Sequence, residues 1–130
     1  MDGQMKATRP EDLTRLFVER ANARDAEGVA ALYEEDAIVA FPPGAVTRGR
    51  TAIQKLFENM LSGEVHFLQE EPLPTILLGD IALTATPAAD EAGARAQVAR
   101  RQADGTWLRI LDRPDFRRAL PSEGSAGSRS

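Results

Sequence analysis

Four side chains in this chain of 130 residues are candidates for acid–base chemistry: Asp112, Gln97, Tyr33 and His66. A carboxylate in an apolar pocket can serve as a general base or acid, and a neighbouring amide can orient it. Tyr33 is the single tyrosine and supplies a hydroxyl donor, and His66 is the single histidine and titrates near neutral pH. The chemistry that these residue types favour is proton transfer without a cofactor.

The composition excludes several other chemistries. The chain has no cysteine and one histidine, so we expect no disulfide, no cysteine nucleophile and no zinc or other metal site. The net charge of −4 argues against nucleic acid or an anionic membrane surface as a partner. The sequence offers neither a membrane-spanning apolar run nor the pattern of a secretory signal, so we expect a cytoplasmic protein.

A β-hairpin over residues 94–112 positions the two principal candidates. Asp104 and Gly105 supply the positive-φ pair that a tight hairpin turn requires. Pairing the strands about this turn places Gln102 opposite Trp107, Ala99 opposite Ile110 and Gln97 opposite Asp112. Gln97 and Asp112 then lie on one face of the sheet. That face also carries Arg95 and Ile110, whereas the opposite face carries Trp107, Arg100 and Arg109.

Each candidate also has a purely structural interpretation. Asp112 is followed by Arg113 and Pro114, so it could cap a strand end or pair with an arginine at the surface. Tyr33 is typical of a core tyrosine whose hydroxyl reaches a partner. His66 alternates with Val65 and Phe67, and this favours the polar face of a strand over a proton shuttle.

The remaining pattern predicts helices in the first half of the chain and strands in the second. We expect one helix after a capping box formed by Thr8 and Glu11, and a short second helix capped by Asp25 and carrying Tyr33. A third helix begins near Thr51, with an apolar stripe at helical spacing. The predicted strands are 38–41, 65–69, 75–78, 81–86, 94–102 and 106–112.

The block NARDAEGVAALYEEDAIVAFPPGAVTRGRTAIQKLFENML, residues 22–61, resembles the ketosteroid isomerase-like branch of the nuclear transport factor 2-like superfamily. The later segment DGTWLRILDRP resembles the last hairpin of its SnoaL-like members. This resemblance implies a cone-shaped, cystatin-like α+β fold, with three N-terminal helices packed on a curved antiparallel sheet. We expect one SnoaL-like domain at residues 8–118, between disordered residues 1–7 and a disordered Ser/Gly tail at 119–130.

The resemblance also implies where isomerase residues would stand. The general base falls on Phe41, the oxyanion tyrosine on Phe17 and the protonated aspartic acid on about Gln97. A phenyl ring neither removes a proton nor donates to an oxyanion. We therefore predict that this chain is not a ketosteroid isomerase.

What the resemblance leaves is the scaffold and its pocket for a small apolar molecule. Its expected lining comprises Phe17, Phe41, Leu56, Phe57, Met60, Arg95 and Ile110. One hypothesis is a cofactor-independent enzyme, a cyclase, isomerase or epoxide hydrolase, with Asp112 as the base or acid, Gln97 or Arg95 orienting it and Tyr33 or His66 assisting. The alternative is a non-catalytic module that binds a ligand or dimerises, its cavity filled by the phenylalanines.

The face that carries Trp107 predicts a homodimer. Tryptophan and arginine are typical interface anchors, and an exposed apolar patch is unusual on a monomer. We expect two copies to bury Trp107 between them, with Arg100 and Arg109 at the rim.

Overall fold

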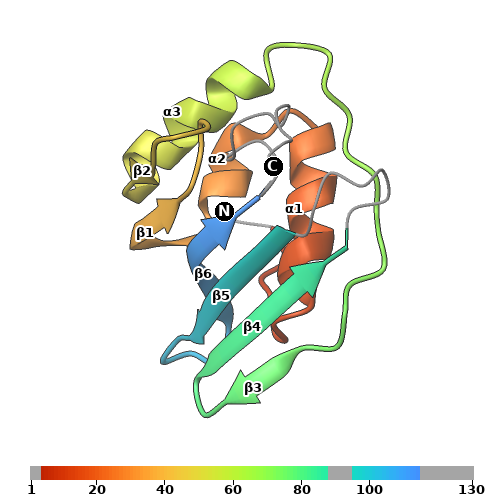
Figure 1. The fold of residues 1–130 in the computed structure, drawn as a ribbon, viewed down its shortest axis with the longest axis vertical. Coiled ribbons are helices and arrows are strands. Elements are labelled where there is room, and N and C mark those ends of the chain that lie inside the picture. The colour runs from red at the N-terminus through yellow and green to blue at the C-terminus, as the bar shows by residue number, and fades with distance from the viewer. Residues whose placement is uncertain (1–3, 88–94, 115–130) are drawn as a thin grey trace, which may run out of the picture.

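The computed structural model describes residues 4–87 and 95–114 of the chain. Helices α1 (Asp12–Asn22), α2 (Ala26–Ala30) and α3 (Arg50–Met60) occur in the first half of the sequence (Figure 1). The strands are β1 (Tyr33–Val39), β2 (Thr47–Arg48), β3 (Ile76–Leu78), β4 (Ile81–Thr86), β5 (Arg95–Arg101) and β6 (Trp107–Arg113). Figure 1 shows α1 and α2 on one side of the sheet, and no helix of the described residues covers the other side of β3 to β6 in this view.

The strands form one curved sheet in the order β2-β1-β6-β5-β4-β3. All neighbouring pairs are antiparallel except β1 and β6, which run parallel. The expected α+β architecture is confirmed, but the sheet is mixed rather than wholly antiparallel. The long stretch of chain between β1 and β6, which includes α3, lets β6 enter beside β1 in the same direction.

Of the two helix caps predicted from the sequence, one is present in the structure. Asp25 caps α2 as predicted, since its side chain accepts a hydrogen bond from the Gly28 N–H. The predicted capping box before α1 is wrong, because the N-cap is Glu11 and its side chain makes no capping bond. Instead Asp12 accepts hydrogen bonds from the backbone N–H groups of Thr8 and Arg9, both at 3.2 Å.

A β-bulge in β6 changes which side chains point inward. Val98 pairs with Leu111, but the next residue of β5, Ala99, pairs with Arg109, so one extra residue stands in β6. The alternation is thereby inverted, and Trp107 and Arg109 lie buried at 6% and 3% exposure on the same side as Asp112. The prediction that Trp107 and Arg109 occupy the outer face is therefore wrong.

Because of the same bulge, the predicted pairing of Gln97 with Asp112 is retained. The turn joins the strands one residue differently from expectation, pairing Arg101 with Trp107 where Gln102 was expected. The extra residue offsets this shift, so that Gln97 does stand opposite Asp112. The expected partner of Ala99, Ile110, is the residue that the bulge displaces.

Two other expected elements take a different form. Residues 65–69 form no strand, because the Asn22 side chain pairs with the backbone N–H and C=O of Phe67, at 2.9 and 2.8 Å, in place of a neighbouring strand. Tyr33 begins β1 and is not part of the second helix, which ends at Ala30. Strand β1 also ends at Val39, before Phe41.

The N-terminal boundary of the domain lies earlier than expected. Ala7 is 2% exposed, and its carbonyl accepts a hydrogen bond of 2.9 Å from the Trp107 N–H. Gln4 donates to the Asp25 carboxylate at 2.7 Å. Residues 4–7 thus belong to the packed domain and not to a disordered terminus, whereas residues 1–3, the boundary at 118 and the tail at 119–130 lie outside the described residues.

Candidate functional site

A cavity of about 550 Å³, here called the inner cavity, lies between α1, α3 and the buried face of the sheet. Most of the predicted pocket residues line it. They are Phe17, Phe41, Leu56, Phe57, Met60, Arg95, Gln97 and Asp112, and His66 lies on the wall as well. The volume falls in the range of small-molecule sites, and the binding of a small apolar molecule there stays a prediction.

Asp112 stands in the inner cavity as a buried carboxylate at 5% exposure. The Tyr33 hydroxyl donates to its Oδ2 at 2.5 Å, and Gln97 Nε2 donates to its Oδ1 at 3.1 Å. The Arg109 guanidinium lies 3.6 Å from Oδ2. Its position rules out a surface ion pair, because Asp112 and Arg109 are both almost wholly buried.

Tyr33 acts on this site from behind the cavity wall. It is fully buried at the start of β1, and its backbone carbonyl accepts two hydrogen bonds from Arg50, at 2.9 and 2.7 Å. Burial raises the pKa of the Tyr33 phenol, and the adjacent Asp112 carboxylate raises it further. The hydroxyl therefore keeps its proton and serves as a donor to Asp112.

The orientation of the Gln97 amide is set by Thr84. The Thr84 hydroxyl lies 3.1 Å from Gln97 Oε1, and both residues are buried in neighbouring strands, β4 and β5. A hydroxyl proton donated to Oε1 leaves the amide N–H₂ to face Asp112. The predicted orienting role of Gln97 thus has a geometric basis, with Thr84 as a partner that the sequence did not indicate.

Arg109 is the principal site residue that sequence reasoning missed. Its guanidinium contacts the rings of Phe17 and Tyr33, at 5.4 and 5.9 Å from the ring centroids. Burial disfavours its charged form, but Tyr33 and Asp112 more than offset this, so the pKa of Arg109 lies above its ordinary value. Strict alternation along the strand placed Arg109 on the outer face. The bulge reverses that placement, and the sequence pattern gave no sign of the bulge.

Three other predicted site residues lie outside the hydrogen-bond network around Asp112. Arg95 lines the cavity but pairs with Glu70, so the cation beside Asp112 is Arg109 and not Arg95. His66 is exposed on the cavity wall, outside the Asp112 network. Ile110 is absent from the cavity lining, because the bulge turns it away.

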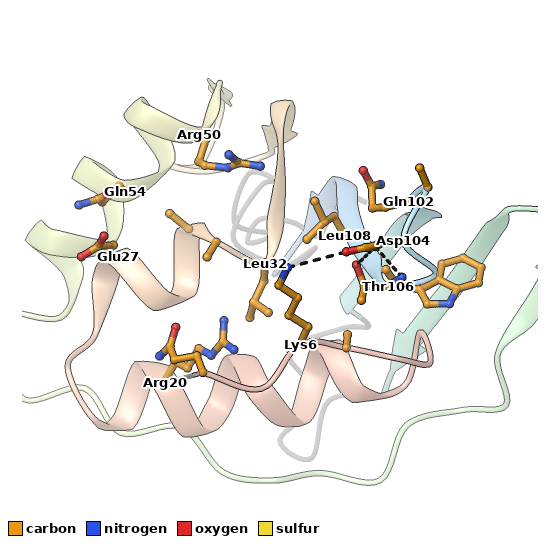
Figure 2. A pocket seen from close by; sticks show the side chains of 16 residues that line it. Lys6, Arg20, Glu27, Leu32, Arg50, Gln54, Gln102, Asp104, Thr106 and Leu108 are labelled. Carbon is orange, nitrogen blue, oxygen red and sulfur yellow. Dashed lines mark hydrogen bonds and ion pairs between the residues drawn. The ribbon is translucent and has the colours of Figure 1, made fainter. Parts of the chain in front are cut away.

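A second hollow of about 700 Å³, here called the N-terminal cavity, lies beside residues 4–7 (Figure 2). Its basic side chains are already engaged. Lys6 pairs with Asp104 at 3.8 Å, Arg20 donates to the Gly28 carbonyl at 2.8 Å, and Arg50 holds the Tyr33 carbonyl. The inner cavity is smaller, but it holds the buried acid–base group and is the better candidate site.

The described residues offer neither a membrane-spanning helix nor a metal-binding cluster. Among residues 4–87 and 95–114, no helix is long and apolar enough to span a membrane. The same part of the chain contains no group of three or more histidine, aspartate or glutamate side chains arranged to hold a metal ion.

Comparison with known proteins identifies the family. The sequence matches the SnoaL-like domain over residues 14–109, which is more than half of the chain. The chain therefore belongs to the SnoaL-like domain family. No curated protein matches it.

Solved structures share the fold at low sequence identity. A ketosteroid isomerase-like protein from Erwinia carotovora atroseptica is 19% identical, with a TM-score of 0.62 over 79% of this chain and 89% of that one. A nuclear transport factor 2-like protein of unknown function from Pseudomonas putida is 21% identical, with a TM-score of 0.60 over 79% and 80%. A Nostoc punctiforme domain of unknown function with a cystatin-like fold is 17% identical, with a TM-score of 0.65 over 78% and 71%. These likenesses confirm the predicted cystatin-like fold.

Proposed function

We propose that the chain binds a small, mainly apolar molecule in the inner cavity and transfers a proton on it without a cofactor, with Asp112 as the acid–base group. The observation that carries this proposal is the placement of Asp112 at 5% exposure on the wall of a cavity otherwise rich in phenylalanine and aliphatic side chains. Glu70 also lines the cavity, but it is engaged by Arg95. Isomerisation, cyclisation and epoxide opening all require such a proton transfer.

The proposed step uses the groups around Asp112 in defined roles. The Asp112 carboxylate takes a proton from a substrate carbon next to a carbonyl group, and the C–H electron pair moves into the carbon–carbon bond of an enolate. The protonated Asp112 then returns the proton to the same or another carbon. Tyr33 and Gln97 are positioning residues that hold the carboxylate at the cavity wall.

One observation favours binding without catalysis as the second candidate function. Both carboxylate oxygens of Asp112 already accept hydrogen bonds from protein donors, so the network holds the carboxylate in place without a ligand. In that case the network around Asp112 shapes a ligand pocket and moves no proton.

Hydrogen–deuterium exchange distinguishes the two candidates. In D₂O, 1-tetralone exchanges the hydrogens next to its carbonyl group by the proposed step, and NMR follows the loss of their signal. We expect the wild-type protein to accelerate this exchange, and Asp112→Asn to lower the acceleration by at least about a hundredfold, as for removal of a general base. The matched control is Asp36→Asn, the same change at an exposed residue of β1.

The outcomes separate the candidates as follows. Saturable binding of 1-tetralone without acceleration of exchange would support the binding module and contradict the enzyme. The absence of both binding and exchange would contradict the pocket itself. Equal acceleration by the wild type and by Asp112→Asn would show that another group moves the proton.

A further inference from the structure

Arg109 is a buried cation on the wall of the inner cavity. It is 3% exposed, and it lies against the Phe17 and Tyr33 rings and within 3.6 Å of Asp112. A guanidinium presents five N–H donors in a fixed plane, and each buried donor needs an acceptor. The acceptors that the protein supplies to Arg109 can therefore be counted.

Among the described residues, one nitrogen of the Arg109 guanidinium has no hydrogen-bond acceptor at all. One terminal nitrogen lies 3.4 Å from the Tyr33 hydroxyl oxygen and faces Asp112, and the other donates to Thr14 Oγ1 at 3.3 Å. Nε is buried and has no hydrogen-bond partner among the described residues. A buried polar atom without a partner destabilises a protein. Because Arg109 lines the inner cavity, a ligand bound there could bring the missing acceptor.

The charges around the inner cavity favour a neutral acceptor over an anionic one. Arg109 is balanced by Asp112, and Arg95, the other arginine of the lining, is balanced by Glu70. A carboxylate entering this site would bring a second negative charge close to Asp112, without a free cation to match it. A carbonyl oxygen accepts an N–H donor without adding charge.

We infer that Arg109 is a specificity-determining residue, which selects uncharged apolar ligands that carry a carbonyl oxygen over the matching hydrocarbon and the matching carboxylate. This inference rests on the proposed function, because it names the ligand class for the same cavity. It adds the residue that recognises the carbonyl group which the proposed proton transfer requires. The carbonyl oxygen binds on the Arg109 side of the cavity, and the hydrocarbon part contacts the phenylalanine-rich wall.

The test compares three probes with the same ring skeleton: 1-tetralone, tetralin and tetralin-1-carboxylate. Titration with detection by ligand NMR gives the dissociation constant of each probe. We expect 1-tetralone to bind at least about tenfold more tightly than either of the others, the ratio typical of one hydrogen bond to a charged donor. Equal affinity for the ketone and the hydrocarbon would overturn the inference, and so would tighter binding of the carboxylate.

Two variants assign the selectivity to Arg109. Arg109→Met alone would leave Asp112 buried without its cation, so the informative protein is the double variant Arg109→Met/Asp112→Asn, compared with Asp112→Asn. Asp112→Asn keeps the preference for the ketone, whereas the double variant binds ketone and hydrocarbon equally. A ketone preference that persists in the double variant would assign the selectivity to another residue.

A readout in the wild-type protein does not depend on whether the double variant folds. The arginine Nε–H resonance that is lost in Arg109→Lys identifies Arg109, and we expect 1-tetralone but not tetralin to shift it. An unshifted resonance at saturating 1-tetralone would overturn the inference. Failure of the proposed function looks different. Loss of deuterium exchange alone leaves the binding selectivity measurable, whereas loss of all binding leaves no selectivity to measure.

Discussion

At Asp112, donors from three strands converge on one carboxylate. Tyr33 comes from β1, Gln97 from β5 and Arg109 from β6 itself. A buried ion pair loses the hydration of both partners, and its attraction compensates for this only where further hydrogen bonds satisfy the remaining atoms. The network meets this condition for Asp112 but not for Arg109 Nε, which has no acceptor among the described residues. The unsatisfied nitrogen therefore bears on ligand binding and does not stabilise the fold.

A prediction at this scale concerns Thr84, the positioning residue behind Gln97. Thr84→Val keeps the shape of the side chain but removes the hydroxyl beside Gln97 Oε1. We expect a loss of about 1–2 kcal/mol in the free energy of unfolding, measured with urea, because a buried amide oxygen loses its donor. Thr84→Ser restores the hydroxyl and is the control. Full stability and an unchanged rate of deuterium exchange in Thr84→Val would contradict the positioning role.

A second residue-scale prediction concerns the missing isomerase groups. Phe41→Asp places a carboxylate in the inner cavity at the position that the family resemblance gives to the base. We expect no isomerisation of a β,γ-unsaturated ketosteroid, because Phe17 still offers no donor at the position that the family resemblance gives to the oxyanion tyrosine. Absorbance of the conjugated product measures the reaction, with circular dichroism to verify folding. A measurable rate in this single variant would contradict the argument.

At the scale of elements, the entry to α1 depends on a carboxylate inside the helix. Asp12 accepts hydrogen bonds from Thr8 and Arg9, and it pairs with Arg15 at 3.4 Å. Burial opposes the charge, but these hydrogen bonds outweigh it and hold the pKa of Asp12 below its ordinary value. A lowered pKa stabilises the native state above the pKa of the unfolded chain, about 3.9, and that stability is lost as the pH falls through the folded pKa.

This linkage gives a prediction with a definite sign. We expect Asp12→Asn to reduce the free energy of unfolding by about 1 kcal/mol near neutral pH, and the difference from wild type to shrink below about pH 3.9. Urea unfolding at a series of pH values measures both quantities. The exposed Asp36→Asn serves as the control. A difference that stays constant down to about pH 2.5 would show that the charge of Asp12 is not the cause.

At the scale of the whole molecule, the outer face of the sheet carries a continuous apolar row. The register pairs Ile76 with Leu83, Leu83 with Val98 and Val98 with Leu111, so the row crosses β3, β4, β5 and β6. Ile76, Leu83 and Leu111 are 64%, 41% and 47% exposed. The homodimer stays a prediction. Its expected interface is now this row and not Trp107, because an exposed apolar row is suited to burial against a second copy.

Two substitutions test this assignment. Leu83→Glu places a charge in the centre of the row, so we expect sedimentation to show weakened association while the protomer stays folded. Trp107→Glu removes a side chain buried in the protomer, and we expect it to destabilise folding by about 3 kcal/mol or more. A wild-type protein that sediments as a monomer at micromolar concentration would exclude the dimer.

The sequence by itself determined the features that depend on local periodicity and turn chemistry. The amphipathic pattern predicted α3, Asp25 capped α2 as expected, and Ile81–Thr86 is the strand that alternation predicted. The apolar pocket residues and the pair of Gln97 and Asp112 also followed from the sequence together with its family resemblance. Local pattern suffices here, because each signal depends on residues close together in the chain.

Only the tertiary structure decided which cation accompanies Asp112. The bulge that brings Arg109 inside is set by how β6 fits between β1 and β5, and strict alternation along one strand does not contain that information. Tyr33 reached Asp112 through a parallel pairing across 79 residues, and Thr84 reached Gln97 through a neighbouring strand. Contacts between strands fix these partners, so they became visible only once the sheet was assembled.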